Sequence, residues 1–289
     1  MIRRSPAQRA FTVFNYAFLT ILSISMFLPF LHILAGSFSS GSAIMQGRVS
    51  LFPADFTLLN YKVVLNDVSI WKAYGVTIFI TAVGTLLNLF FTCLMAYGLS
   101  KPDLKGRSFV ILLVLFTMIF QAPLIPSYLV VKSLGMLNTL WSLIIPGLIA
   151  AFNLIIMISF FQNIPDSLID AAKIDGCSDY RTLWSVVLPL SLPSLSTIGL
   201  FYAVAHWNGY FAAIMYIRDP DLYPLQVKLR RLIVENDAEG MLQRLAVTVQ
   251  SIEGIKMASI IAATIPVLVV YPMIQKHFVK GSMLGSIKG

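Results

Sequence analysis

Residues able to do chemistry are few in this chain, and they lie in two places. A short polar segment carries the carboxylates Asp166, Asp170 and Asp175, and an imidazole, His206, lies deep inside an apolar run. The chain has no HExxH or GxSxG motif and no pair of aspartates within an apolar run, so hydrolysis inside a membrane has no catalytic constellation. We therefore predict no catalytic residue and a function other than enzymatic turnover.

The cysteines and phosphate-binding motifs also exclude several classes. Cys93 lies in an apolar run and Cys177 in a polar loop, which gives neither a disulfide framework nor a metal-ligand spacing. No GxxxxGK[ST] loop is present, so the chain should not bind ATP. We expect no metal and no cofactor on this chain.

The composition indicates the kind of protein that must position these residues. Of 289 residues, 57% are hydrophobic and only 12% are charged, whereas soluble domains carry about 25% charged residues. The net charge of +8 comes from basic residues scattered between apolar runs rather than from basic blocks. This pattern excludes nucleic-acid binding and suits lipid headgroups, so the chain should be an integral membrane protein.

Six apolar runs without Asp, Glu, Lys or Arg divide the chain. A helix of about 20 such residues crosses the roughly 30 Å hydrocarbon layer. We therefore predict an all-α, multi-pass fold in one domain over residues 1–289, with both termini on the same side. The runs are Phe11 to Ala35, Tyr74 to Leu99, Phe109 to Val131, Leu140 to Phe161, Ser191 to Ile217 and Met257 to Ile274.

The first run follows Arg3, Arg4 and Arg9, but it is too long for the core of a secretory signal, so we expect it to be retained as a membrane helix. Lys and Arg are nearly balanced between the two sides. The crowding of three of them in the turn 101–107 favours a cytoplasmic N-terminus. The long loops at about 36–73 and 218–256 would then be external, the second with amphipathic stretches at 225–234 and 241–252.

Residues 163–189 have the signals of a helix, a turn and a second helix. Pro165 suits a first helical turn, and Gly176 supplies a left-handed cap. Ser178 can cap the next helix, which Pro189 limits. Ala171 and Ala172 leave a thin surface that another protein could approach. From these residues alone, a mechanical lever and a connector lying on the bilayer are both open.

This segment resembles the EAA loop of ATP-binding-cassette importer permeases. That pattern is Glu-Ala-Ala, three residues, Gly, nine residues, Ile, one residue and Leu-Pro. Both spacings are matched here, with Asp in place of Glu and Val186 in place of Ile. The matched positions are Asp170, Ala171, Ala172, Gly176, Leu188 and Pro189, and Asp175 matches an acidic residue common before the glycine in sugar permeases.

The resemblance implies a type I importer permease fold in which this loop, at about 162–190, is a cytoplasmic coupling helix that docks on an ATPase. The partners it implies are a second permease subunit, two ATPase subunits that hold ATP and Mg, and an extracytoplasmic solute-binding protein. The location it implies is the bacterial cytoplasmic membrane, with both termini inside and a cytoplasmic tail at about 275–289. Transport would proceed by alternating access.

Other stretches are similar to carbohydrate-uptake permeases related to the smaller maltodextrin permease subunit. The stretch 52–61 is similar to that group's first external loop, and Trp207-Asn208 resembles a pair in its fifth helix. The tail 275–289 resembles a subgroup linked to oligosaccharides from plant or algal polysaccharides, alginate among them. An oligosaccharide substrate is therefore implied.

Polar and aromatic side chains within the apolar runs could line a sugar path, because hydroxyl groups need hydrogen bonds and sugar faces stack on aromatic rings. The alternative for each is a contact between helices or an anchor at the membrane interface. The candidates are Asn88, Gln121, Asn153, Tyr202, His206, Trp207, Asn208 and Tyr210. A permease for a peptide, polyamine or glycerol phosphate and a self-contained secondary transporter stay open as alternatives.

Overall fold

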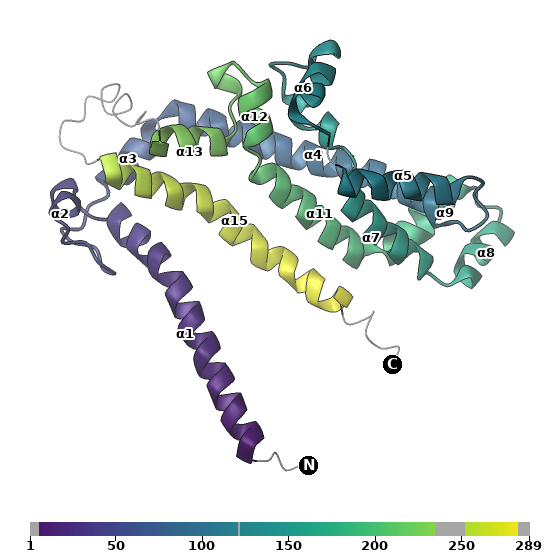
Figure 1. Cartoon of the computed structure of the whole chain (residues 1–289), viewed down its shortest axis with the longest axis horizontal. Coiled ribbons are helices and arrows are strands. Elements are labelled where there is room, and N and C mark those ends of the chain that lie inside the picture. Colours follow the sequence, from purple (N-terminus) through teal and green to yellow (C-terminus); the bar gives the residue numbers. More distant parts are fainter. Residues whose placement is uncertain (1–5, 121, 235–251, 283–289) are drawn as a thin grey trace. The chain divides into compact units, whose positions relative to one another are not determined.

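The computed structural model describes residues 6–120, 122–234 and 252–282, which form helices and connecting loops without a β-strand in those ranges (Figure 1). An isolated antiparallel bridge joins Ser39 and Phe56. The chain divides into two compact units, one of residues 1–70 with 229–266 and the other of residues 71–228 with 267–289.

Three of the six predicted spans are continuous helices: α1 (Pro6–Ser37), α4 (Val68–Ser100) and α15 (Ile252–Ser282). Each contains a stretch long and apolar enough to cross a membrane. The helix α15 extends beyond its predicted apolar run at both ends, so the first part of the predicted tail is helical. Residues 283–289 lie outside the described chain.

The other three predicted spans are broken, which the hydropathy pattern did not show. The first two are α5 (Arg107–Ile119) with α6 (Leu124–Ser133), and the turns η1 (Leu140–Leu143) and η2 (Ile145–Gly147) with α7 (Ala151–Gln162). The third is α11 (Leu192–Trp207), which pairs with the bent Asp179–Leu190 stretch that lies before the predicted run. The second pair is bent by 50° and the third by 85°. Counting each bent pair as one span gives six spans.

Prolines account for the position of these breaks, because proline lacks the N–H that continues a helix. Pro123 precedes α6, Pro146 lies in η2, and Pro189 and Pro193 flank the 85° bend. The run predicted to end at Ile217 also divides, because α11 stops before the Asn208–Gly209 turn and a short helix, α12 (Phe211–Tyr216), follows.

In the first unit, the loop predicted to be external is folded around Asn60. It comprises α2 (Gly41–Met45), α3 (Leu59–Asn66) and their connections. The buried Asn60 amide donates to the carbonyl oxygens of Ser37, at 3.1 Å, and Ser39, at 3.0 Å. A Cβ on Gly254 of α15 would lie 2.8 Å from this amide, so glycine permits α15 to approach α3 closely.

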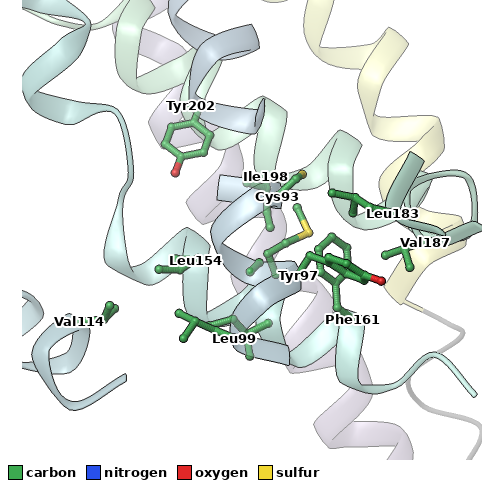
Figure 2. Close-up of a cluster of buried hydrophobic side chains, with 13 residues drawn as sticks. Cys93, Tyr97, Leu99, Val114, Leu154, Phe161, Leu183, Val187, Ile198 and Tyr202 are labelled. Atoms are coloured by element: carbon green, nitrogen blue, oxygen red, sulfur yellow. The ribbon is translucent and has the colours of Figure 1, made fainter. Parts of the chain in front are cut away.

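The second unit has an apolar core built from α4, α7, α11 and the η3 turn (Leu183–Val187). Figure 2 shows side chains from these elements converging. Leu183 and Val187 are each 1% exposed, and they pack with Cys93 and Phe161 among others. Residues 183–187, which belong to the predicted coupling loop at about 162–190, are therefore anchored in the core of the unit.

Candidate functional site: the coupling segment and the polar centre of the helices

The segment predicted to couple to an ATPase, residues 162–190, is called the coupling segment, and its first helix is α8 (Asp166–Ile174). Gly176 follows with φ +77°, its N–H donates to Lys173 O at 3.0 Å, and the Cys177 N–H donates to Ala172 O at 2.9 Å. These two bonds form a Schellman motif, which satisfies the last carbonyls of the helix. The left-handed cap predicted at Gly176 is confirmed.

The second half of the segment begins with the short helix α9 (Asp179–Thr182). The Ser178 hydroxyl accepts a hydrogen bond from the Arg181 N–H at 3.4 Å, so the predicted cap is present. The π-helical turn η3 and α10 (Leu188–Leu190) follow, and the chain then bends into α11. Pro189 lies in that last turn, as the pattern predicts.

The motif residues face different ways on this scaffold. Asp170, Ala171, Asp175 and Gly176 are exposed, whereas Ala172 is buried and only 6% exposed. Only one of the two alanines is therefore on the exposed surface.

Five large apolar side chains are also exposed on the segment, namely Leu168 at 43%, Ile174 at 86%, Tyr180 at 72%, Trp184 at 52% and Leu190 at 53%. None of them is among the residues predicted to contact the ATPase, although Ile174 directly precedes the Asp175–Gly176 turn and Leu190 directly follows the Leu188–Pro189 part of the motif. Exposed apolar side chains gathered with exposed carboxylates are typical of a surface that docks a protein.

An ion pair attaches the segment to the end of α4. The Lys101 ammonium donates to Asp179 Oδ1 and lies 4.5 Å from the centre of the Tyr97 ring. The hydrogen bond from Lys101 lowers the pKa of Asp179 from its usual value. Figure 1 shows α8 and α9 near this end of α4. In the sequence, Lys101 indicates only the orientation of the chain in the membrane, and its contact with Asp179 was not predicted.

At the centre of the second unit, side chains from α4 and α11 bind the break before α7. The Asn88 amide, which is fully buried, donates to Gly147 O and Leu148 O, both at 2.8 Å. Its Oδ1 lies 2.7 Å from His206 Nε2. Because Oδ1 can only accept, His206 Nε2 carries the proton in this bond.

Tyr202 supports the same break. Its hydroxyl accepts from the Ala150 N–H at 3.0 Å and is 2.8 Å from Thr92 Oγ1. Asn88 and Tyr202 thus satisfy backbone groups that the broken helix leaves without partners. His206 contributes through its bond to the Asn88 side chain.

Three further path candidates lie at the end of α11 and in the turn that follows it. The Asn208 amide donates to Val204 O at 3.0 Å, closing the end of α11, and Trp207 is the last residue of that helix. Tyr210 follows in the turn before α12. Gln121 lies outside the described residues.

A cavity of about 290 Å³ lies beside the polar network, entirely within the second unit. Asn153, Tyr202 and His206 are its polar side chains, and most of the remaining wall is apolar. It is lined by Ile80, Leu143, Gly147, Ala150, Asn153, Phe201, Tyr202, Ala205, His206, Gly209, Ala212, Ala213 and Pro224. Within the described ranges, no group of three or more His, Cys, Asp or Glu residues could hold a metal ion.

The structure is that of a multi-pass helical transport protein. It has apolar helices, broken spans and an exposed polar helical segment. Residues 107–282 match the family described as the inner membrane component of binding-protein-dependent transport systems. The chain belongs to this family, whose members are permease subunits of ATP-binding-cassette transporters and not enzymes themselves.

Individual relatives agree with this assignment. The polygalacturonan/rhamnogalacturonan transport system permease protein YtcP of Bacillus subtilis (strain 168) is 47% identical over 97% of this chain and 99% of its own length. The galactooligosaccharides transport system permease protein GanQ of the same organism is 31% identical over 96% and 95%.

A solved structure has the same fold. It is the crystal structure of a bacterial ABC transporter involved in the import of the acidic polysaccharide alginate. The matched chain has a TM-score of 0.91 and 38% identity, over 96% of this chain and 100% of that chain. The predicted type I importer permease fold is therefore confirmed.

Proposed function

We propose that this chain is the permease subunit of an importer of oligosaccharides derived from polysaccharides, with residues 162–190 as its coupling segment. The observation that carries this proposal is the geometry of that segment, a capped exposed helix continuous with a turn anchored in the core. The substrate class is supported by the relatives. YtcP and GanQ are named as transport proteins for saccharides, and the structural relative is described as an importer of alginate.

The complete transporter would contain a second permease subunit, two ATPase subunits with ATP and Mg, and an extracytoplasmic solute-binding protein. The coupling segment, the turn 101–107 and both termini would be cytoplasmic. The loops 36–73 and 218–256 would face the binding protein. In this arrangement Ile174, Tyr180 and the exposed motif carboxylates contact the ATPase.

The segment transmits movement through the residues it shares with the core. When ATP closes the ATPase dimer, α8 is displaced with the surface on which it docks. Leu183 and Val187 pack against α4 and α7, so η3 cannot shift without moving those helices. The 85° bend at Ser191 then redirects the movement into α11, which lines the cavity. This sequence of contacts supports alternating access.

A self-contained secondary transporter, the alternative that the sequence left open, is not favoured by the family assignment. Buried ionisable groups usually mark ion pathways in such proteins, and none of the six apolar runs contains Asp, Glu, Lys or Arg. To distinguish the ATP-driven importer from the secondary transporter, uptake of a rhamnogalacturonan disaccharide is measured in proteoliposomes that contain the complete transporter. ATP-dependent uptake supports the importer, whereas uptake by this chain alone along an ion gradient would support the alternative.

A further inference from the structure

The cavity of the second unit contains a polar side chain whose hydrogen-bonding capacity is unused. Asn153 lines the cavity and is only 6% exposed. Within the described part of the chain, its carboxamide makes no hydrogen bond, unlike the neighbouring Asn88 amide, which binds two carbonyls and His206. The Asn153 amide is open to the cavity and is not among the sealed side-chain atoms that lack a partner, so a ligand in the cavity can reach it and form hydrogen bonds with it.

The other polar groups of the wall are already engaged. The Tyr202 hydroxyl is bound to Thr92 and to the Ala150 N–H, and His206 Nε2 is bound to Asn88. These bonds hold both side chains rigidly while Asn153 stays available. Its Nδ2 can donate and its Oδ1 can accept, which matches neighbouring hydroxyl groups on a sugar ring.

The cavity wall carries no charged side chain, so it favours an uncharged sugar residue over a sugar carboxylate. No Lys, Arg, Asp or Glu lines the cavity, and its apolar members include Ile80, Leu143 and Phe201. The start of α7 adds a partial positive charge of about half a unit. That is less than the full cation that a desolvated carboxylate requires. Hydroxyl groups and the apolar faces of an uncharged sugar residue suit this wall better.

We infer that this cavity is a saccharide subsite in which Asn153 binds the hydroxyl groups of an uncharged sugar residue. The inference rests on the proposed function and assigns part of the substrate to this subunit. Any carboxylate of the substrate would then be bound outside this cavity.

The test measures equilibrium binding of a rhamnogalacturonan disaccharide to the purified complete transporter without its binding protein. Asn153→Leu should raise the Kd about tenfold, because the apolar isostere removes both hydrogen bonds. Phe152→Leu is the control, because it introduces the same residue one position earlier at an exposed site. Unchanged binding in Asn153→Leu would overturn the inference.

Two more variants keep the test decisive if Asn153→Leu assembles poorly. Ala205→Phe fills the cavity from α11 and should weaken binding at least tenfold, whereas Val204→Phe, at an exposed neighbouring position outside the wall, should not. Equal binding by these two variants would contradict the subsite.

Asn153→Asp distinguishes hydroxyl binding from carboxylate binding. An ionised carboxylate at this position still accepts from sugar hydroxyls but loses the amide donor, so the Kd should rise by less than it does in Asn153→Leu. A loss larger than that of Asn153→Leu would mean that the uronate carboxylate occupies the cavity and would overturn the inference. If the unmodified transporter shows no ATP-dependent uptake at all, the proposed function fails instead.

Discussion

At the scale of single residues, the two glycines with the clearest structural requirement lie in the coupling segment and at the polar centre. Gly176 has φ +77°, and a Cβ on it would meet no atom within 4 Å. The requirement there is backbone conformation. Gly84 is constrained by space, because an added Cβ would lie 2.5 Å from His206 Nε2.

Gly176→Val should impair coupling, because a left-handed conformation costs a β-branched residue roughly 1–2 kcal/mol or more. The Schellman bonds that end α8 would be strained, and we expect ATP-dependent uptake to fall at least fivefold. Gly176→Asn is the matched control, since asparagine tolerates this conformation, and it should retain most of the uptake. Equal uptake by the two variants would exclude a role for the turn geometry.

Gly84→Ala should destabilise the purified protein by about 1–3 kcal/mol, the usual cost of overpacking, because His206 must move from its bond with Asn88. Gly98→Ala, on the same helix and with no atom within 4 Å of the new Cβ, should leave the Tm unchanged or raise it slightly. Thermal unfolding in detergent measures both. A Tm for Gly84→Ala equal to that of Gly98→Ala would contradict the packing described at His206.

At the scale of elements, the residue patterns predicted the ends of the helices within residues 162–190 correctly but did not predict where helices bend or break. The cap at Gly176, the cap at Ser178 and the end of the second helix near Pro189 depend on neighbouring residues, and all are present. The helix breaks were missed because hydropathy averages over a span and does not register Pro146 or the Asn208–Gly209 turn.

The roles of the polar side chains were harder to predict, because they depend on distant partners. Asn88 lies 59 residues from Gly147 in sequence and Tyr202 lies 52 from Ala150. No local pattern distinguishes these structural contacts from the unpaired amide of Asn153. The contact of Lys101 with Asp179 also joins residues far apart in sequence.

The ion pair between Lys101 and Asp179 is an element-scale contact whose effect should be on coupling. Both groups are partly or largely exposed, so the pair adds at most about 1 kcal/mol to stability. Lys101→Glu should lower the saccharide imported per ATP hydrolysed while changing the Tm by little. The double variant Lys101→Glu/Asp179→Lys should recover part of that ratio, and a double variant no better than the single one would argue against the pair.

At the scale of the whole molecule, six apolar runs were sufficient to predict the class of fold, because lipid penalises charge and unpaired backbone over a fixed thickness. The division into two units was not predicted. It depends on close helix contacts such as Asn60 with Gly254, which hydropathy does not encode.

The central claim is that residues 162–190 couple this chain to a separate ATPase. The most direct measurement purifies the chain from its native membrane in mild detergent, identifies the proteins that remain bound and assays ATP hydrolysis. Ile174→Asp changes the most exposed apolar side chain of the segment, and Leu104→Asp, an exposed leucine outside the segment, is its control.

We predict that the unmodified chain and Leu104→Asp retain an ATPase and a second permease subunit, with hydrolysis stimulated by the loaded binding protein. Ile174→Asp should lose the ATPase or lose that stimulation. If the unmodified chain is recovered alone and imports saccharide into liposomes without ATP, or if Ile174→Asp retains full stimulated hydrolysis, the coupling role of the segment is contradicted.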